Sequence, residues 1–186
     1  MKTIRLLLCI VLLIALPLSN SNAGGRNHDK HVEITFTWSR IASHGSNQLA
    51  VWIEDAEGTH IRTLYASQFT AMGGYKMRPV SLSEWTEKYD IRNATPEQVD
   101  AISGPTPQPG NQTMVWDCKD MSGKRVSKGV YVIRMEANIK NEDKMFYRGE
   151  IKIGRKAGKG TGVITFSRPE LADGQVLFRD VAVEYK

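Results

Sequence analysis

The sequence predicts an all-β protein, an antiparallel β-sandwich of about eight strands with two short inserted helices. Short segments in which apolar and polar residues alternate recur along the chain, and turn-forming residues separate them. Residues 81–103 break the strand rhythm. Alternation with a period of two places one face of a strand against a core, and many short strands separated by turns are typical of sandwiches.

The first three strands are predicted within residues 32–67. In VEITFTW, Val32 to Trp38, the apolar residues fall on one face and the glutamate and threonines on the other. QLAVWIED is more continuously apolar, as in a strand that is covered on both faces. The turn residues Asp55 to Gly58 lead into THIRTLYAS, so these two segments should pair as a hairpin.

Residues 81–103 indicate two short helices. SLSEW begins with Ser81 and carries Glu84 three residues later, while TPEQVDAI offers Thr95 as N-cap and Gln98 at the third helical position. Both patterns fit a capping box, in which the cap and the third residue bond each other's backbone N–H groups. The second helix should end before Gly104 and Pro105, which do not continue a helix.

Strands resume after Gly110. The segments are QTMVWD, GVYVIRMEANIK, KMFYRGEIKIG, VITFS and QVLFRDVAVEYK. The second of them places five apolar residues on one face: Tyr131, Ile133, Met135, Ala137 and Ile139. The last alternates Leu177, Val181, Val183 and Tyr185, so that this strand should also cover the core with one face.

The N-terminus has the features of a secretory signal peptide. Lys2 and Arg5 precede an apolar run from Leu6 to Leu16, and a small-residue stretch ends at Ala23. The run is too short to span a bilayer as a helix. We therefore expect a signal peptide over 1–23 that is cleaved near Ala23, a flexible leader over 24–31 and one domain over 32–186. The mature protein should be periplasmic or secreted and should not span the membrane.

The charge and the cysteine content argue against nucleic-acid partners and against disulfide or thiol chemistry. The formal net charge of +5 includes Lys2 and Arg5, and without them about +3 remains, which is too little to indicate nucleic-acid binding. After cleavage Cys118 is the one remaining cysteine, so no intramolecular disulfide can form. With no CxxC partner, Cys118 is expected to be a buried small hydrophobe and not a reactive thiol.

No catalytic, nucleotide-binding or metal-binding pattern is complete. The GxSxG motif is absent, and His44 and His60 are the two histidines of the domain, so no catalytic triad can be argued. The stretch Gly158-Lys159-Gly160 lacks the Ser or Thr of a phosphate loop and opens a strand. His28 and His31 supply too few fixed ligands for a metal. We expect a protein that is not an enzyme and has no metal site.

The densest local pattern is WDCKDMSGKRVSKGVY, which begins at Trp116. Asp117 and Asp120 could suggest calcium, but they lack the further ligands of a site with roughly six to eight oxygens. We expect these carboxylates to accept hydrogen bonds from the backbone of the following turns, while Gly123 and Gly129 supply positive φ.

This pattern, W-D-x-x-D-x-x-G-x-x-V-x-x-G-x-Y, resembles the Ig-like domain of the flagellar hook-cap protein and its relatives. Together with AVWIEDAEGTHIRTLY, DAISGPTPQPG and FYRGEIKIG it is similar to the predicted periplasmic protein family called domain of unknown function 2271, over residues 32–185. The resemblance implies an Ig-like sandwich. It implies no established activity.

The segment DAISGPTPQPG, Asp100 to Gly110, also resembles the acceptor sequence D-x-x-[ST]-G-A-[ST] of periplasmic flavin transferases. By that resemblance FMN would be joined to Thr106 through a phosphoester, and Asp100, Ser103 and Gly104 would form the recognition frame. Pro105 stands where the pattern has alanine. A plain connector between the second helix and the next strand would use the same glycine and proline residues, to stop the helix and to turn the chain.

Two functions follow from these observations. The first is an exported, non-enzymatic envelope module that binds a partner, for which the family resemblance suggests a PepSY-type membrane redox protein. The alternative is a covalent FMN carrier in periplasmic electron transfer, flavinylated at Thr106 by a flavin transferase.

Overall fold

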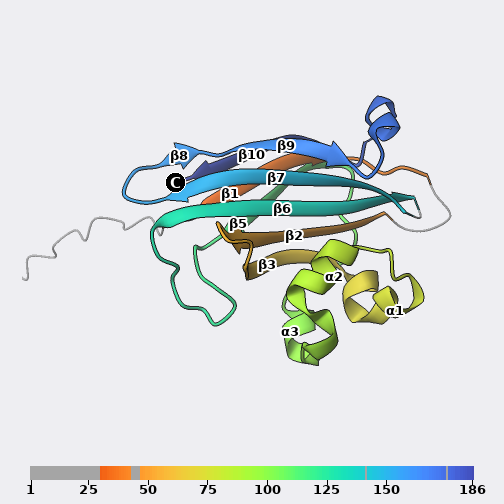
Figure 1. Cartoon of the computed structure of the whole chain (residues 1–186), viewed down its shortest axis with the longest axis horizontal. Helices are drawn as coiled ribbons and strands as arrows, with labels where there is room; N and C mark the ends of the chain where they lie inside the picture. Colours follow the sequence, from red (N-terminus) through yellow and green to blue (C-terminus); the bar gives the residue numbers. More distant parts are fainter. Residues whose placement is uncertain (1–29, 43–46, 141, 175) are drawn as a thin grey trace, which may run out of the picture.

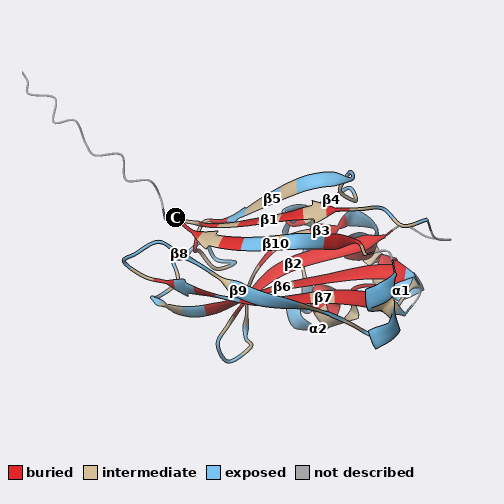
Figure 2. Ribbon diagram, turned by 90° about the horizontal axis from the view of Figure 1, so that it is seen from above, coloured by how far each residue is buried: buried red, intermediate tan, exposed pale blue. Residues whose placement is uncertain are grey.

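The computed structural model describes residues 30–42, 47–140, 142–174 and 176–186, and within them two sheets pack face to face (Figures 1 and 2). All eight predicted strands are present, together with the two-residue strands β4 and β8. The strands are β1 (Val32–Trp38), β2 (Gln48–Asp55), β3 (His60–Ser67), β4 (Ser103–Gly104), β5 (Gly110–Trp116), β6 (Gly129–Lys140), β7 (Asp143–Ile153), β8 (Gly158–Lys159), β9 (Thr161–Phe166) and β10 (Phe178–Tyr185). The predicted signal peptide and residues 24–29 of the leader lie outside the described residues.

One sheet has the strand order β5-β1-β10-β8 and the other β4-β3-β2-β6-β7-β9. The pairing is antiparallel except between β3 and β4. The predicted hairpin of β2 and β3 is confirmed, with β2 lying centrally between β3 and β6. The all-β sandwich predicted from the alternation is therefore confirmed.

The alternating residues of the strands form the core between the sheets. The apolar face of β1 is buried, as is the five-residue face predicted for β6. Trp116, Phe178, Met145 and Tyr147 complete this core from the neighbouring strands. Figure 2 shows this buried layer between the two sheets. Burial of these apolar side chains is the main favourable contribution to folding.

Strict alternation is wrong for the last strand. Leu177, Val183 and Tyr185 are buried as predicted, but Phe178 is buried as well. The reason is an irregularity in the pairing of β1 with β10, where the partners step from Thr35–Ala182 to Thr37–Arg179. Asp180 lies at this bulge with a φ of 55°. An extra residue in one strand shifts which side chains face the core.

A second layer of apolar residues lies on the outer face of the larger sheet. Residues 68–102, here called the helical insert, cover this face at β3, β2 and β6 (Figure 1). Trp52 and Ala50 of β2 pack there against Leu82 and Trp85 of the insert. The strand β2 is thus covered on both faces, which explains its continuously apolar sequence.

The insert contains more helical turns than the sequence indicates. Its elements are a π-helical turn η1 (Thr70–Gly74), α1 (Tyr75–Met77), α2 (Ser83–Tyr89), a 3₁₀ turn η2 (Ile91–Asn93) and α3 (Pro96–Asp100), and a further 3₁₀ turn, η3 (Pro169–Asp173), precedes β10. The capping box at Thr95 and Gln98 is confirmed. The one proposed for Ser81 and Glu84 is wrong. Leu82 precedes α2 without a side-chain cap, and Ser81 is buried in a hydrogen bond with Thr70.

Side chains from the outer face of β6 replace the missing cap of α2. The Glu136 carboxylate accepts a hydrogen bond from the Trp85 backbone N–H at 3.0 Å, and Asn138 Oδ1 accepts one from the Leu82 N–H at 2.8 Å. Glu136 also pairs with Lys144 at 2.9 Å. Glu136 is fully buried, and burial raises the pKa of its carboxyl while Lys144 opposes that rise.

Replacement of Glu136 by Ala should therefore cost about 3–5 kcal/mol of unfolding free energy, because it leaves the buried Lys144 ammonium and the Trp85 N–H without their partner. Urea denaturation measures this loss. Glu150→Ala is the matched control, since Glu150 pairs with Arg148 at the same 2.9 Å but both side chains are half exposed. The control should lose no more than about 1 kcal/mol. Equal losses in the two variants would contradict the assigned role of Glu136.

The Tyr147 ring occupies the space left by two glycines that face each other across β7 and β9. Gly149 pairs with Gly162. A Cβ at either position would overlap the Tyr147 hydroxyl, and at Gly162 it would also lie 2.7 Å from Gly149 Cα. This arrangement is an aromatic side chain filling the gap beside strand glycines.

Gly162→Ala should therefore destabilise the protein by about 1–3 kcal/mol through overpacking. Gly154→Ala is the control, because a Cβ there meets nothing within 4 Å, and its effect should stay within about 0.5 kcal/mol. Thermal or urea unfolding of both variants checks the difference. If Gly162→Ala unfolds like the wild type, the packing of the Tyr147 ring does not require the two glycines.

Candidate functional site

The structure places the predicted acceptor residues along a short stretch of sheet edge. Asp100 is the exposed last residue of α3. Ser103 and Gly104 form β4 and pair with Ala66 and Ser67 at the end of β3. Thr106 follows, partly buried, and its hydroxyl donates to the Asn47 carbonyl at 3.3 Å.

Tyr65 holds the backbone of this loop. Its hydroxyl donates to the carbonyl oxygens of Gly104 at 3.3 Å and Pro105 at 2.6 Å. A Cβ at Gly104 would lie 3.0 Å from the Tyr65 ring, so a glycine permits this close approach. Ser103, Gly104 and Thr106 thus share one ordered segment. Within the described residues, no hydrogen bond or ion pair joins Asp100 to these three.

The segment after β5 serves the turn as predicted. The Asp117 carboxylate accepts from the Lys119 N–H, and that of Asp120 accepts from the N–H groups of Ser122 and Lys124. The positive φ expected at Gly123 is confirmed, but the one expected at Gly129 is wrong because Gly129 starts β6.

Cys118 of the same turn is fully buried, as expected. Burial is the main reason that the pKa of its thiol is raised. A raised pKa keeps the sulfur protonated and weakens it as a nucleophile.

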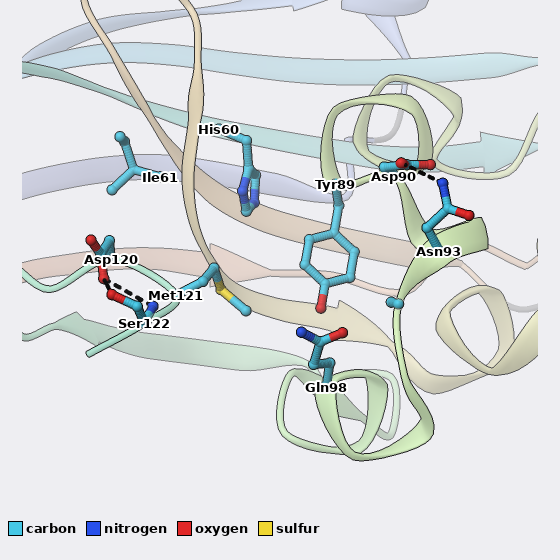
Figure 3. Close-up of a pocket in the computed structure, with 10 residues that line it drawn as sticks. His60, Ile61, Tyr89, Asp90, Asn93, Gln98, Asp120, Met121 and Ser122 are labelled. Atoms are coloured by element: carbon cyan, nitrogen blue, oxygen red, sulfur yellow. Dashed lines mark hydrogen bonds between the residues drawn. The ribbon is translucent and has the colours of Figure 1, made fainter. Parts of the chain in front are cut away.

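A second candidate site, the insert cleft, opens where the helical insert meets the end of the sandwich (Figure 3). Its volume is about 520 Å³, within the range of small-molecule sites. Three separate segments line it: His60 and Ile61 of β3, residues of the insert (Tyr89, Asp90, Asn93, Ala94 and Gln98), and Asp120, Met121 and Ser122 of the turn after β5. The turn is held against β3 because the Met121 N–H donates to the Ile61 carbonyl and Arg62 to that of Asp120.

Aromatic rings form one wall of the insert cleft. The Tyr89 ring stacks on Trp85, with centroids 5.6 Å apart and planes 9° from parallel. His60 lies 5.4 Å from Tyr89 at a tilt of 57°. Both Trp85 Nε1 and His60 Nε2 bond the Thr63 hydroxyl, at 3.1 and 2.8 Å. The wall is therefore fixed from behind, so the Tyr89 ring presents a rigid apolar surface to the cleft.

His60 is neutral at the pH of most compartments. Burial, assisted by the nearby Lys88 ammonium, lowers the pKa of its imidazole from 6.5 to about 4. Lys88 itself donates to the Gly58 carbonyl at 2.7 Å. The charges that line the insert cleft are the carboxylates of Asp90 and Asp120, and no lysine or arginine is among its described lining residues.

The comparisons with known proteins place the chain in a family. A family model described as predicted periplasmic protein (DUF2271) matches residues 29–165. The chain belongs to this family. No protein with a curated description and no solved structure matches it. None of the helices in the described ranges has the length and apolar character needed to span a bilayer.

Sequence reasoning missed the insert cleft in this DUF2271 protein. It identified His60 only as too isolated for a triad, and it explained Asp120 and Gln98 fully by a turn and a helix cap. The lining residues come from segments that are far apart in the chain, so no local spacing marks them. The signal in the sequence that could have indicated the cleft was the position of His60 and Asp120 beside two predicted turns.

The lowered pKa of His60 predicts a specific loss of stability in acid. The unfolded chain binds a proton on this imidazole near pH 6.5, whereas the folded chain resists it down to about pH 4. Stability is therefore lost as the pH falls through this window, by at most roughly 3 kcal/mol. His60→Gln keeps a hydrogen-bonding group for Thr63 but does not titrate. Urea unfolding at pH 7 and pH 4.5 should show a loss larger by about 1–3 kcal/mol in the wild type. An identical pH dependence in both proteins would contradict the shift.

Proposed function

We propose that this DUF2271 protein is an exported, non-enzymatic envelope module that binds its ligand or partner in the insert cleft. The observation that carries the proposal is the composition of the cleft. Its aromatic wall is held in place by stacking and hydrogen bonds, and polar side chains from three segments surround it. Concave sites with an apolar surface and a few placed polar groups are typical of binding sites. The family's periplasmic description supports a role in the envelope.

The state of His60 supports binding over catalysis. With a pKa of about 4 the imidazole is far from the ideal for a general base near neutral pH. Its Nε2 is occupied by the Thr63 hydroxyl, and Thr63 is itself buried. Besides Tyr89, Ser122 is the one residue with a hydroxyl group among the described lining residues. Its Oγ donates to the Asp120 carboxylate at 2.6 Å, so its hydrogen-bond partner is not the His60 imidazole.

Photocrosslinking in the native host tests this function. A photoreactive amino acid introduced at Met121, which lines the cleft and is 40% exposed, should give covalent adducts with an envelope component. The same amino acid at Met77 is the control, since Met77 is 74% exposed and does not line the cleft. Adducts that are absent from Met121, or equally abundant from both positions, would contradict binding at the cleft.

A second candidate function is supported by the geometry of the acceptor loop. In a covalent FMN carrier the Thr106 oxygen would attack the FMN phosphate of FAD, with AMP as leaving group and loss of the hydroxyl proton. Thr106 lies beside an edge strand, where a second enzyme can approach, and its hydroxyl makes one long hydrogen bond. Tyr65 already fixes the backbone conformation that a transferase would grip. A PepSY-type membrane protein would then be the electron-transfer partner.

Intact mass after co-expression with a periplasmic flavin transferase tests this candidate. The wild-type chain should gain one FMN phosphoester, and Thr106→Ala should gain none. Thr113→Ala, in β5, the next strand along the chain, should keep the adduct. Pro105→Ala restores the residue of the acceptor pattern and should raise the modified fraction. Absence of an adduct from both the wild type and Pro105→Ala, or its presence in Thr106→Ala, would overturn the assignment.

A further inference from the structure

The hydrogen-bonding groups of the insert cleft identify a class of ligand. Within the described residues, no hydrogen bond engages the Gln98 amide nitrogen, the Asn93 amide oxygen or the Tyr89 hydroxyl. Gln98 uses only its oxygen, which accepts from the Thr95 N–H at 2.8 Å. Asn93 uses only its nitrogen, which donates to Asp90 at 2.7 Å. The opposite end of each amide therefore stays available to a ligand.

These groups are arranged around the aromatic wall. Figure 3 shows Tyr89 between His60 and Gln98, with its hydroxyl end directed toward Gln98 and Met121. One face of the Tyr89 ring is covered by Trp85, and the ring also lines the cleft. The cleft thus combines a flat apolar surface with donors and acceptors at its sides.

The charges exclude several ligand classes. Asp90 and Asp120 would repel a phosphate, a carboxylate or a nucleic acid, and the described lining offers no cation to offset them. A purely apolar ligand would leave the carboxylates and amides of the lining desolvated and unpaired. The lining therefore favours a ligand that carries no negative charge, has many hydroxyl donors and acceptors, and has an apolar face.

A sugar ring has these properties, since its C–H groups form a flat apolar face and its hydroxyls point outward around the edge. We propose that the insert cleft binds a neutral saccharide, with a sugar ring stacked on Tyr89 and its hydroxyls bonded to Gln98, Asn93 and the two carboxylates. This inference rests on the proposed function of the cleft as a binding site. It adds the chemical class of the ligand.

Titrating the ¹⁵N-labelled mature chain with three defined oligosaccharides tests the inference. The probes are maltohexaose, cellohexaose and hexa-N-acetylchitohexaose, and spermidine serves as a cationic comparison. At least one oligosaccharide should shift the amide signals of Tyr89, Asn93 and Ser122 in a saturable way. Saturation by spermidine together with no shift from any oligosaccharide would overturn the saccharide assignment, as would no response to any probe at about 10 mM.

Two variants assign the contacts. Gln98→Glu keeps the oxygen that caps α3 but removes the free amide donor, so it should weaken saccharide binding by about three- to tenfold without loss of the fold. Gln112→Glu, on the edge strand β5 of the other sheet, makes the same substitution outside the cleft and should leave binding unchanged. Tyr89→Leu removes the ring and should weaken binding by about tenfold or more. If Gln98→Glu and Tyr89→Leu both bind like the wild type, the sugar does not occupy the cleft.

The two sets of experiments fail in different ways. If Met121 crosslinks to a protein while no oligosaccharide binds, the cleft is a binding site and the saccharide assignment is wrong. If neither Met121 nor the oligosaccharides give a signal, the proposed function of the cleft fails as well.

Discussion

The arrangement of the helical insert depends on the hydrogen bond that the buried Glu136 carboxylate accepts from the backbone of α2. Apolar burial of Trp52, Leu82 and Trp85 holds the insert on the sheet, but apolar contact is not directional and would permit several orientations. The hydrogen bonds from the backbone of α2 to Glu136 and Asn138 fix one of them. The helix begins without a cap of its own, so the sheet supplies the acceptors that its first N–H groups require.

The helix α2 connects the hydrogen bond at Glu136 to the insert cleft. Trp85 donates its backbone N–H to Glu136 at the start of α2 and stacks its ring under Tyr89 at the end of the same helix. The position of the aromatic wall is therefore set by a polar contact on the outer face of β6. A buried ion pair often contributes little net stability. In this protein the pair of Glu136 with Lys144 orients an element that carries the candidate site.

The sequence was informative where structure is local and periodic. The eight strands, the hairpin turn at Asp55–Gly58 and the capping box at Thr95 each depend on residues within a few positions of one another. The Ser81 capping box failed because a tertiary contact with Thr70 competes for the same hydroxyl. The strict alternation predicted for the last strand failed for a similar reason, because the bulge at Asp180 depends on the register with the partner strand β1. The insert cleft joins three distant segments, which no spacing rule can bring together.

The capping box at Thr95 connects the two candidate sites, although its sequence pattern indicates only a helix start. Its Gln98 oxygen is committed to the cap, which turns the amide nitrogen of the same side chain toward the cleft. The helix that it starts is five residues long and ends at Asp100, the first residue of the acceptor pattern. So short a helix has little stability of its own, and its position depends on the cap and on packing. The geometry of the cleft and the start of the acceptor loop therefore share one local determinant, which is why a residue fully explained by capping also lines the candidate cleft.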